Sequence, residues 1–306
     1  MSGSPFDAPQ VQVRVAGRTD AGQKRRENQD SFLAAEFPEG DHGLLLEPDV
    51  DTGRPVLGEF LLGPKGALCL VADGMGGAAA GGLASSVAVA SIHDEMRRHW
   101  AGDRASTPRK FAQRLKEALE ASNSRIHETS LADPSCRGMG TTATAVGVLE
   151  TFLYLAQVGD SRAYLVRNGE AVQLTRDQSY TQHLVDSGAL TEEEAEQSAN
   201  RNMILQALGT APDVDVELTY QELRRRDIVI VCSDGLYRVV TRGDIGEVAS
   251  RAAEPARICD ELVDLANFRG GPDNITVVAA LFDGAGLAEP GDGDTVGHRV
   301  LLIDGA

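Results

Sequence analysis

The sequence predicts an α+β protein in which helices and strands occur in runs and pack as layers. Eight short segments have the apolar pattern of β-strands, and two long segments with helical periodicity follow each other directly before a block of strands. The strict alternation of strand and helix that a doubly wound fold needs is missing from this pattern. These two observations favour α+β layers over a doubly wound parallel sheet.

The predicted strands are spread along most of the chain. They are expected at 11–17, 67–72, 142–149, 152–158, 163–167, 171–175, 227–233 and 275–282. The dipeptide Asn168-Gly169 separates two of them, and this dipeptide is typical of a type I′ hairpin turn. At least these two strands should therefore pair antiparallel, so the sheet is not wholly parallel.

Four longer helices are predicted from apolar residues spaced three and four positions apart. They are expected at 82–100, 108–130, 241–251 and 255–268. Pro108 stands at a first-turn position, and Thr241 with Asp244 has the spacing of a capping box. A second box, from Thr191 to Glu194, predicts a short helix within a polar segment.

Four segments are expected to lie outside the regular layers. They are a flexible N-terminal tail at 1–10, a loop insertion at 38–66, a surface flap at 176–210, and a linker with a C-terminal tail at 284–306. Glycine and proline are frequent in the loop insertion, and glycine and acidic residues in the linker. The last residues, HRVLLIDGA, have the pattern of one additional strand.

Composition excludes several classes of protein. The net charge is −17, from 46 acidic and 29 basic residues, so a polyphosphate backbone would be repelled and nucleic acid is not an expected partner. No apolar run approaches the roughly 18 residues of a membrane span, and the N-terminus lacks a signal-peptide pattern. The four cysteines are widely spaced, which fits buried free thiols better than zinc sites or disulfides. We therefore expect a cytoplasmic protein with no membrane partner.

Aspartates stand at the ends of several predicted strands. Asp73 and Asp234 each end a strand, Asp160 follows one, and Asp273 precedes one. A carboxylate at the rim of a buried layer is unfavourable by several kcal/mol unless it is paired or binds a cation. Arg162 is close enough in sequence to pair with Asp160, whereas the other three have no adjacent base. Oxygen ligands in this number suit Mg²⁺ or Mn²⁺, and the lack of clustered His and Cys argues against zinc.

Two interpretations of these carboxylates remain open on the residues alone. Asp-Gly is a common turn dipeptide, so Asp73-Gly74 and Asp234-Gly235 fit ordinary turns about as well as a cation site. The glycine-rich stretch at 74–77 matches neither the G-x-G-x-x-G nor the Walker pattern. A nucleotide site is therefore not supported.

Six short motifs occur in a fixed order along the chain. They are RRENQDS at 25–31, VADGMGG at 71–77, GMGTT at 138–142, VGDSRAY at 158–164, CSDGL at 232–236 and GGPDNIT at 270–276. In this order and at about this spacing they resemble the motifs of metal-dependent serine/threonine protein phosphatases, the PPM or type 2C family, and above all its bacterial branch. The resemblance implies one PPM-type phosphatase domain over 11–283.

The resemblance implies a four-layer α-β-β-α sandwich with a binuclear site for two Mn²⁺ or Mg²⁺ ions at one end of the β-sandwich. By their place in the motifs, Asp73 would bridge both ions and the Gly74 carbonyl would bind one of them. Asp234 and Asp273 would complete the shell of the first ion. Asp30 would serve the second ion directly or through water.

The same resemblance implies a reaction and its substrate. Arg25 would grip the substrate phosphate, because a guanidinium fits phosphate bidentately and keeps its charge. Asn274 and Asp160 belong to the motifs as supporting residues, with Asp160 tied to Arg162 or to backbone amides. The implied activity is hydrolysis of phosphoserine and phosphothreonine on proteins by a hydroxide that bridges the ions, opposing a bacterial serine/threonine kinase. A monomer is expected.

Two other functions are compatible with the same motifs. One is a catalytically weak module that uses this fold to bind a partner, and the other is a phosphatase of an anti-sigma-factor antagonist. The intact set of motif aspartates together with Arg25 favours an active enzyme over a binding module. The third possibility shares the chemistry and differs only in the partner.

Three residues depart from the family pattern. Met75 stands where many eukaryotic relatives have a histidine thought to protonate the leaving alcohol, so that proton must come from another source. Gln29 replaces a glutamate before Asp30, which weakens one possible contact of the second ion. Arg137 stands where some members have an aspartate for a third ion, with Asp133 the nearest carboxylate, so a third ion is not supported.

Overall fold

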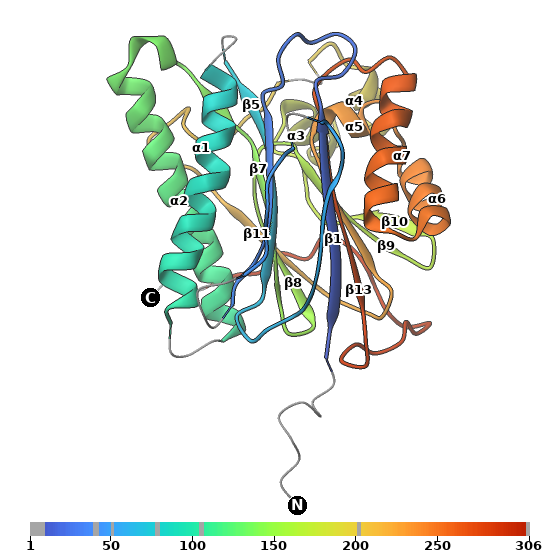
Figure 1. Ribbon diagram of the computed structural model, residues 1–306. Coiled ribbons are helices and arrows are strands. Elements are labelled where there is room, and N and C mark those ends of the chain that lie inside the picture. Colours follow the sequence, from blue (N-terminus) through green and yellow to red (C-terminus); the bar gives the residue numbers. More distant parts are fainter. Residues whose placement is uncertain are drawn as a thin grey trace, which may run out of the picture.

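Two antiparallel β-sheets lie face to face in the computed structural model, and a pair of helices covers the outer face of each sheet (Figure 1). The structure describes residues 10–38, 43–49, 52–76, 80–103, 107–200 and 203–303. The α+β class and the four layers expected from the sequence are therefore confirmed.

The first sheet has six strands and carries the C-terminal pair of helices. Its order is β10 (Glu170–Gln173), β9 (Arg162–Arg167), β12 (Ile228–Cys232), β13 (Ile275–Asp283), β1 (Gln12–Asp20) and β4 (Val56–Leu61). The helices α6 (Arg242–Ala252) and α7 (Pro255–Phe268) pack on its outer face, shown in orange in Figure 1.

The second sheet has seven strands and carries the other helix pair. Its order is β11 (Glu217–Glu222), β8 (Phe152–Val158), β7 (Ala143–Leu149), β5 (Ala67–Met75), β2 (Asp30–Glu36) and β3 (Leu45–Leu46), with the short β6 (Gly140–Thr141) paired to the end of β5. The covering layer consists of α1 (Ala80–Glu95), which continues into the π-helical turn η2 (Met96–Ala101), and α2 (Pro108–Ala132). Shorter helices are η3 (Pro134–Cys136), α3 (Tyr180–Asp186), α4 (Glu192–Gln197) and α5 (Asp234–Tyr237).

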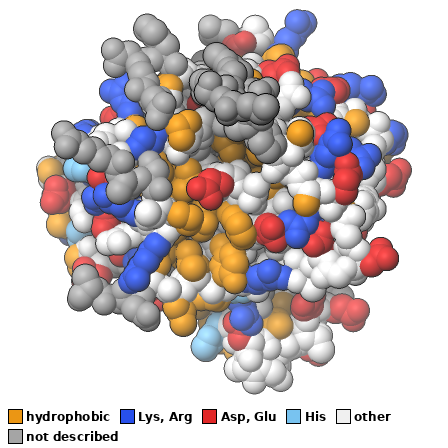
Figure 2. All heavy atoms as spheres, turned by 90° about the horizontal axis from the view of Figure 1, so that it is seen from below, with side chains coloured by type: hydrophobic (Ala, Val, Ile, Leu, Met, Phe, Trp, Pro, Cys, Tyr) orange, Lys and Arg blue, Asp and Glu red, His pale blue; other side chains and the backbone are white. Residues whose placement is uncertain are grey.

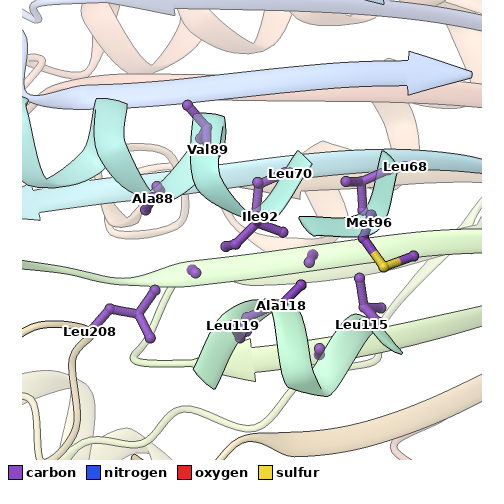
Figure 3. Packing of buried hydrophobic residues seen from close by; sticks show 14 of the residues in the cluster. Leu68, Leu70, Ala88, Val89, Ile92, Met96, Leu115, Ala118, Leu119 and Leu208 are labelled. Atoms are coloured by element: carbon purple, nitrogen blue, oxygen red, sulfur yellow. The ribbon is translucent and has the colours of Figure 1, made fainter. Parts of the chain in front are cut away.

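Buried apolar side chains form three layers between these four. In the layer between the second sheet and its helices, Leu70 of β5 faces Ile92 of α1 and Leu119 of α2 (Figure 3). Along β5 the next residue, Val71, points the other way and packs between the two sheets against residues such as Val278 of β13. Both faces of β5 are therefore buried, which explains the continuous apolar run in its sequence.

The local signals in the sequence are confirmed where they depend on turn and cap chemistry. Asn168 and Gly169 have φ values of 52° and 85°, as a type I′ turn needs, and β9 and β10 pair antiparallel. The capping boxes at Thr241 and Thr191 both form, at the starts of α6 and α4. All four cysteines are free and buried, as expected.

Other elements differ from the sequence prediction. The segment 38–66 is not one loop, because β3 and β4 lie within it as edge strands of the two sheets. The pattern of β4 is hidden because its side chains are only partly buried at a sheet edge. The strand β11 was not expected, since Thr219 and Gln221 are polar residues that are nevertheless buried in it.

The segment after β13 packs on the domain over much of its length. Leu287 is buried, and both carboxylate oxygens of Asp294 accept hydrogen bonds from Arg224 at 2.8 Å. Further on, the Leu301 N–H donates to the Leu218 carbonyl at 2.8 Å and extends the ladder beyond β11. The expected flexible linker is thus a packed segment in this part of the structure, and the expected extra strand is a short ladder. Residues 1–9 of the expected N-terminal tail lie outside the described residues.

The two ends of the sandwich differ in character. In Figure 1 the blue loop between β1 and β2 lies at the upper end, together with the C-terminal end of α7. Figure 2 views the lower end, where hydrophobic side chains gather at the centre with charged side chains around them. None of the described helices combines the length and the hydropathy that a membrane crossing needs.

Replacing Ile92 with alanine should destabilise the fold by about 2–5 kcal/mol, because this side chain is fully buried between α1, α2 and the second sheet. The matched control is Leu131→Ala on α2, where the side chain is 73% exposed and the change should stay within about 0.5 kcal/mol. Urea unfolding midpoints measure both. Equal effects of the two substitutions would contradict this packing.

Candidate metal centre

Five aspartates converge at the upper end of the sandwich. Asp30 begins β2, Asp73 lies near the end of β5, Asp160 follows β8, Asp234 begins α5 and Asp273 precedes β13. Asp30 and Asp73 stand directly opposite each other on paired strands. The charge of Asp73 interacts with all four of the others. The structure therefore brings together every aspartate that the sequence singled out.

Asp30 links the two sheets. It belongs to the second sheet, but its Oδ2 accepts hydrogen bonds from Ser233 Oγ at 2.6 Å and from Thr276 Oγ1 at 2.7 Å, both of which follow or lie in strands of the first sheet. Burial raises the pKa of Asp30 to about 6. These two hydroxyl partners were not expected, although both belong to the motifs CSDGL and GGPDNIT.

Asp73 is held by its backbone. Its N–H donates to Thr142 Oγ1 at 2.9 Å, and its carbonyl accepts from Thr142 N–H and Thr141 Oγ1, each also at 2.9 Å. Burial and then the neighbouring carboxylates raise the pKa of Asp73 well above its usual range. The next residue must be glycine, since a Cβ on Gly74 would lie 2.1 Å from the Gly81 carbonyl oxygen.

Asp234 and Asp273 each bond to an arginine. Arg238, one helical turn after Asp234, forms an ion pair with its carboxylate. Arg25 Nη2 donates to Asp273 Oδ2 at 2.7 Å. Burial raises the pKa of Asp234 to about 8 even though Arg238 lowers it. The ion pair with Arg238 was not foreseen, but the i, i+4 spacing of Asp234 and Arg238 was a usable signal for it.

Asp160 bonds to neither of its two expected partners, Arg162 or backbone amides, among the described residues. Arg162 instead binds Asp177 through two hydrogen bonds, of 2.9 and 2.7 Å, and its guanidinium stacks 3.7 Å from the ring centre of Tyr237. Among the described residues, Asp160 Oδ2 accepts only from the Tyr237 hydroxyl, at 3.2 Å. Burial raises the pKa of Asp160 to about 6. Asp160 therefore faces the acidic cluster without a direct cation of its own.

Asn274 holds the loop that carries Arg25. Its side-chain amide donates to the carbonyls of Ala21 and Glu27 at 3.0 and 2.9 Å, and its Oδ1 accepts from Gln29 N–H at 2.9 Å. These three bonds fix both ends of the segment 21–29 against the start of β13. Asn274 is thus a positioning residue, which agrees with its supporting place in the motif.

The cluster has the donors that a hard cation needs. Three buried carboxylate oxygens, Oδ1 of Asp30, Asp160 and Asp234, have no hydrogen-bond partner in the described structure. Leaving such oxygens unpaired is unfavourable, whereas oxygen ligands without thiolate or imidazole suit Mg²⁺ or Mn²⁺. As they stand, no three acidic, His or Cys side chains of the described residues are arranged to hold one ion, and two of the five carboxylates bond to arginines instead. The donor set therefore fits divalent cations that would replace Arg25 and Arg238 as the counter-charge.

The chain is similar to known proteins in sequence and in fold. A family model described as Protein phosphatase 2C matches residues 59–268. The serine/threonine protein phosphatase PstP of Mycobacterium tuberculosis is 36% identical over 88% of this chain, and the chain spans 45% of that protein's length. A putative protein phosphatase 2C-type of Streptococcus pyogenes is 32% identical, over 87% of this chain and 96% of the relative. A solved structure of the PstP catalytic domain in complex with two manganese ions superposes with a TM-score of 0.69 at 33% identity, covering 89% of this chain and 99% of that one.

The buried carboxylates predict that the protein without divalent cations loses stability as the pH rises. The pKa of Asp30 and of Asp160 is about 6 in the folded state and that of Asp234 about 8, so above about pH 4 the folded state keeps protons that the unfolded chain has released. Stability in EDTA should therefore fall between about pH 4 and 8, by on the order of 1.4 kcal/mol for each pKa unit of difference.

Thermal unfolding in EDTA at several pH values measures this slope. Saturating Mn²⁺ should flatten it, because the cation rather than a proton then balances the carboxylates. A melting temperature in EDTA that rises or stays level over this pH range would contradict the arrangement of the cluster.

Proposed function

The chain belongs to the protein phosphatase 2C family, and we propose that it hydrolyses phosphoserine and phosphothreonine on proteins with the help of divalent cations. The observation that carries this proposal is the convergence of five aspartates, three with an unpartnered oxygen, beside an arginine at one end of the sandwich. The curated relatives that support it are named as serine/threonine phosphatases.

We infer that two Mn²⁺ or Mg²⁺ ions bind at the cluster. Asp73, opposite Asp30, would contact both ions, with the Gly74 carbonyl, Asp234 and Asp273 on the first and Asp30 on the second. When bound, such a pair of ions offsets the charge of the phosphoryl oxygens and makes water a strong nucleophile near neutral pH. The manganese-bound PstP domain supports this inference by similarity.

The chain's own residues prepare the site for this chemistry. Ser233 and Thr276 occupy one oxygen of Asp30 and so fix the direction of the other. The bonds to Thr141 and Thr142 fix the backbone of Asp73 at the end of β5. Preorganised ligands of this kind do not have to be ordered when the substrate arrives.

We propose that Arg25 binds the substrate phosphate. Its side chain is 56% exposed and uses one nitrogen for Asp273, which leaves the rest of the guanidinium fork for a phosphate. Asn274 keeps the loop of Arg25 against the cluster. The proton for the leaving alcohol does not come from Met75, which has no titratable group.

The wider setting follows from the substrate. Phosphoserine and phosphothreonine on a protein are products of a protein kinase, so we propose that the chain opposes a serine/threonine kinase. The alternative of a weak binding module requires no turnover, and an anti-sigma-factor antagonist is one further candidate substrate. The monomeric state and the cytoplasmic location stay predictions.

Replacing Asp73 with asparagine should lower turnover by at least about 10³-fold, because the isosteric amide keeps the shape of the residue but removes the charge that interacts with all four other carboxylates. The assay is hydrolysis of p-nitrophenyl phosphate and of a phosphoserine peptide at saturating Mn²⁺. Asp213→Asn, at an exposed position, is the control and should retain wild-type turnover. Activity of Asp73→Asn within tenfold of wild type would remove Asp73 from the site.

Replacing Arg25 with alanine should lower kcat/KM by roughly ten- to two-hundredfold, which corresponds to about 1.5–3 kcal/mol for a charge-assisted hydrogen bond. The loss should come mainly from a higher KM, with kcat also lower if the contact tightens in the transition state. Mn²⁺ affinity, measured by calorimetry, should not fall, because Arg25 competes with the cation for Asp273 and does not bind the cation itself. Arg26→Ala is the control, since Arg26 is exposed and makes none of the described contacts with the cluster. Equal effects at 25 and 26, or loss of Mn²⁺ binding in Arg25→Ala, would refute the assignment.

A further inference from the structure

A basic cavity of about 490 Å³ adjoins the acidic cluster. Lys24, Arg25, Arg238 and Arg269 line it, and Asp273 is the single carboxylate among its described lining residues. This concentration of positive charge is unusual in a chain of net charge −17. The cavity is also larger than one phosphate group needs, because volumes of this order hold whole small-molecule ligands.

The four cations differ in how many of their donors are already used. Arg269 is committed, with both terminal nitrogens bonded to Asp244 and one of them also to the Val239 carbonyl at 2.8 Å. Arg25 uses only one nitrogen, on Asp273. Lys24 is exposed and has no ion pair or hydrogen bond in the described part of the chain. The free donors of the cavity therefore include those of Lys24 and Arg25, whereas Arg269 is held in place by its bonds.

Arg238 lies between the cavity and the cluster. Its side chain is 20% exposed, it lines the cavity, and its ion pair with Asp234 is made through one terminal nitrogen. A guanidinium keeps its positive charge at all working pH values. Arg238 is therefore a permanent cation beside the position proposed for the substrate phosphate.

We propose that Lys24 and Arg238 form a second anion subsite, which binds an acidic side chain or a second phosphate close to the phosphorylated residue of the protein substrate. The inference rests on the proposed function, in which Arg25 binds the phosphate that is removed. Lys24, which has no ion pair in the described part of the chain, and Arg238, which uses one terminal nitrogen for Asp234, then provide donors in the same cavity, and a carboxylate or phosphate of the same substrate segment accepts from them. The subsite thus selects substrate segments that carry more than one negative group.

The test compares phosphoserine peptides that differ at one neighbouring position. That position carries alanine, glutamate or a non-hydrolysable phosphonate analogue of phosphoserine, and kcat/KM is measured with Mn²⁺ at low ionic strength. The wild type should prefer the glutamate and phosphonate peptides over the alanine peptide by roughly three- to tenfold. The phosphonate peptide separates a second phosphate from a carboxylate as the preferred group. Raising the salt concentration should reduce the preference, because the subsite is open to solvent.

Two variants of Lys24 and one neighbour make the test specific. In Lys24→Ala the ratio between the glutamate and alanine peptides should fall towards one. In Lys24→Glu it should invert, and a peptide with lysine at that position should become the better substrate. Arg26→Ala is the matched control, because Arg26 has the same charge on the same loop but does not line the cavity. The control should keep the wild-type ratio.

The outcomes separate this subsite from the proposed function. The substrate p-nitrophenyl phosphate has no neighbouring group that the subsite could bind. If the protein does not hydrolyse it with Mn²⁺, the proposed function is wrong, and the subsite that rests on it is wrong too. Normal turnover of p-nitrophenyl phosphate with equal kcat/KM for all three peptides would overturn the subsite alone. An equal fall of the ratio in Lys24→Ala and Arg26→Ala would assign the preference to general surface charge and also overturn the subsite.

Discussion

The structure depends most on the negative charge that it gathers at one end of the sandwich. Asp30, Asp160 and Asp234 are buried there and Asp73 is partly buried, and burial raises the pKa of each. Hydrophobic packing and hydrogen bonds elsewhere must hold these carboxylates together against their mutual repulsion. The three hydrophobic layers, which leave little freedom for the sheets to slide, provide that restraint.

The position of one sheet relative to the other also sets the geometry of the cluster. Asp30 comes from the second sheet, but the hydroxyls that orient it belong to Ser233 and Thr276 on the side of the first. Asn274, at the start of β13, likewise fixes the loop that leads into β2. A change in the packing between the sheets would therefore alter the geometry of the cluster through these bonds. The arrangement of the site thus depends on the packing of the core.

Much of this could be predicted from the sequence, because strong local signals agree with the fold. Strands buried on both faces, such as β5, appear as continuous apolar runs, and the aspartates at their ends are visible without a structure. What could not be predicted depends on contacts between distant segments. Arg162 is two residues from Asp160, yet it binds Asp177 in the flap, since the β9–β10 hairpin brings that carboxylate within 2.7 Å. The edge strand β4 and the polar strand β11 were not predicted for a related reason. Their pairing with neighbouring strands defines them, and their own residue patterns do not.

The arginines show how the chain balances this charge. Asp273 and Asp234 are the two carboxylates of the cluster with an arginine directly bonded to them, and both arginines line the same cavity. If either arginine leaves its carboxylate to bind an external anion, another cation must balance the charge of that carboxylate. Under the proposed assignment, cation binding at the cluster and anion binding in the cavity would be linked through the same two ion pairs, and by reciprocity each would favour the other. The acidic cluster and the basic cavity are in this sense two halves of one site, joined by Arg25 and Arg238.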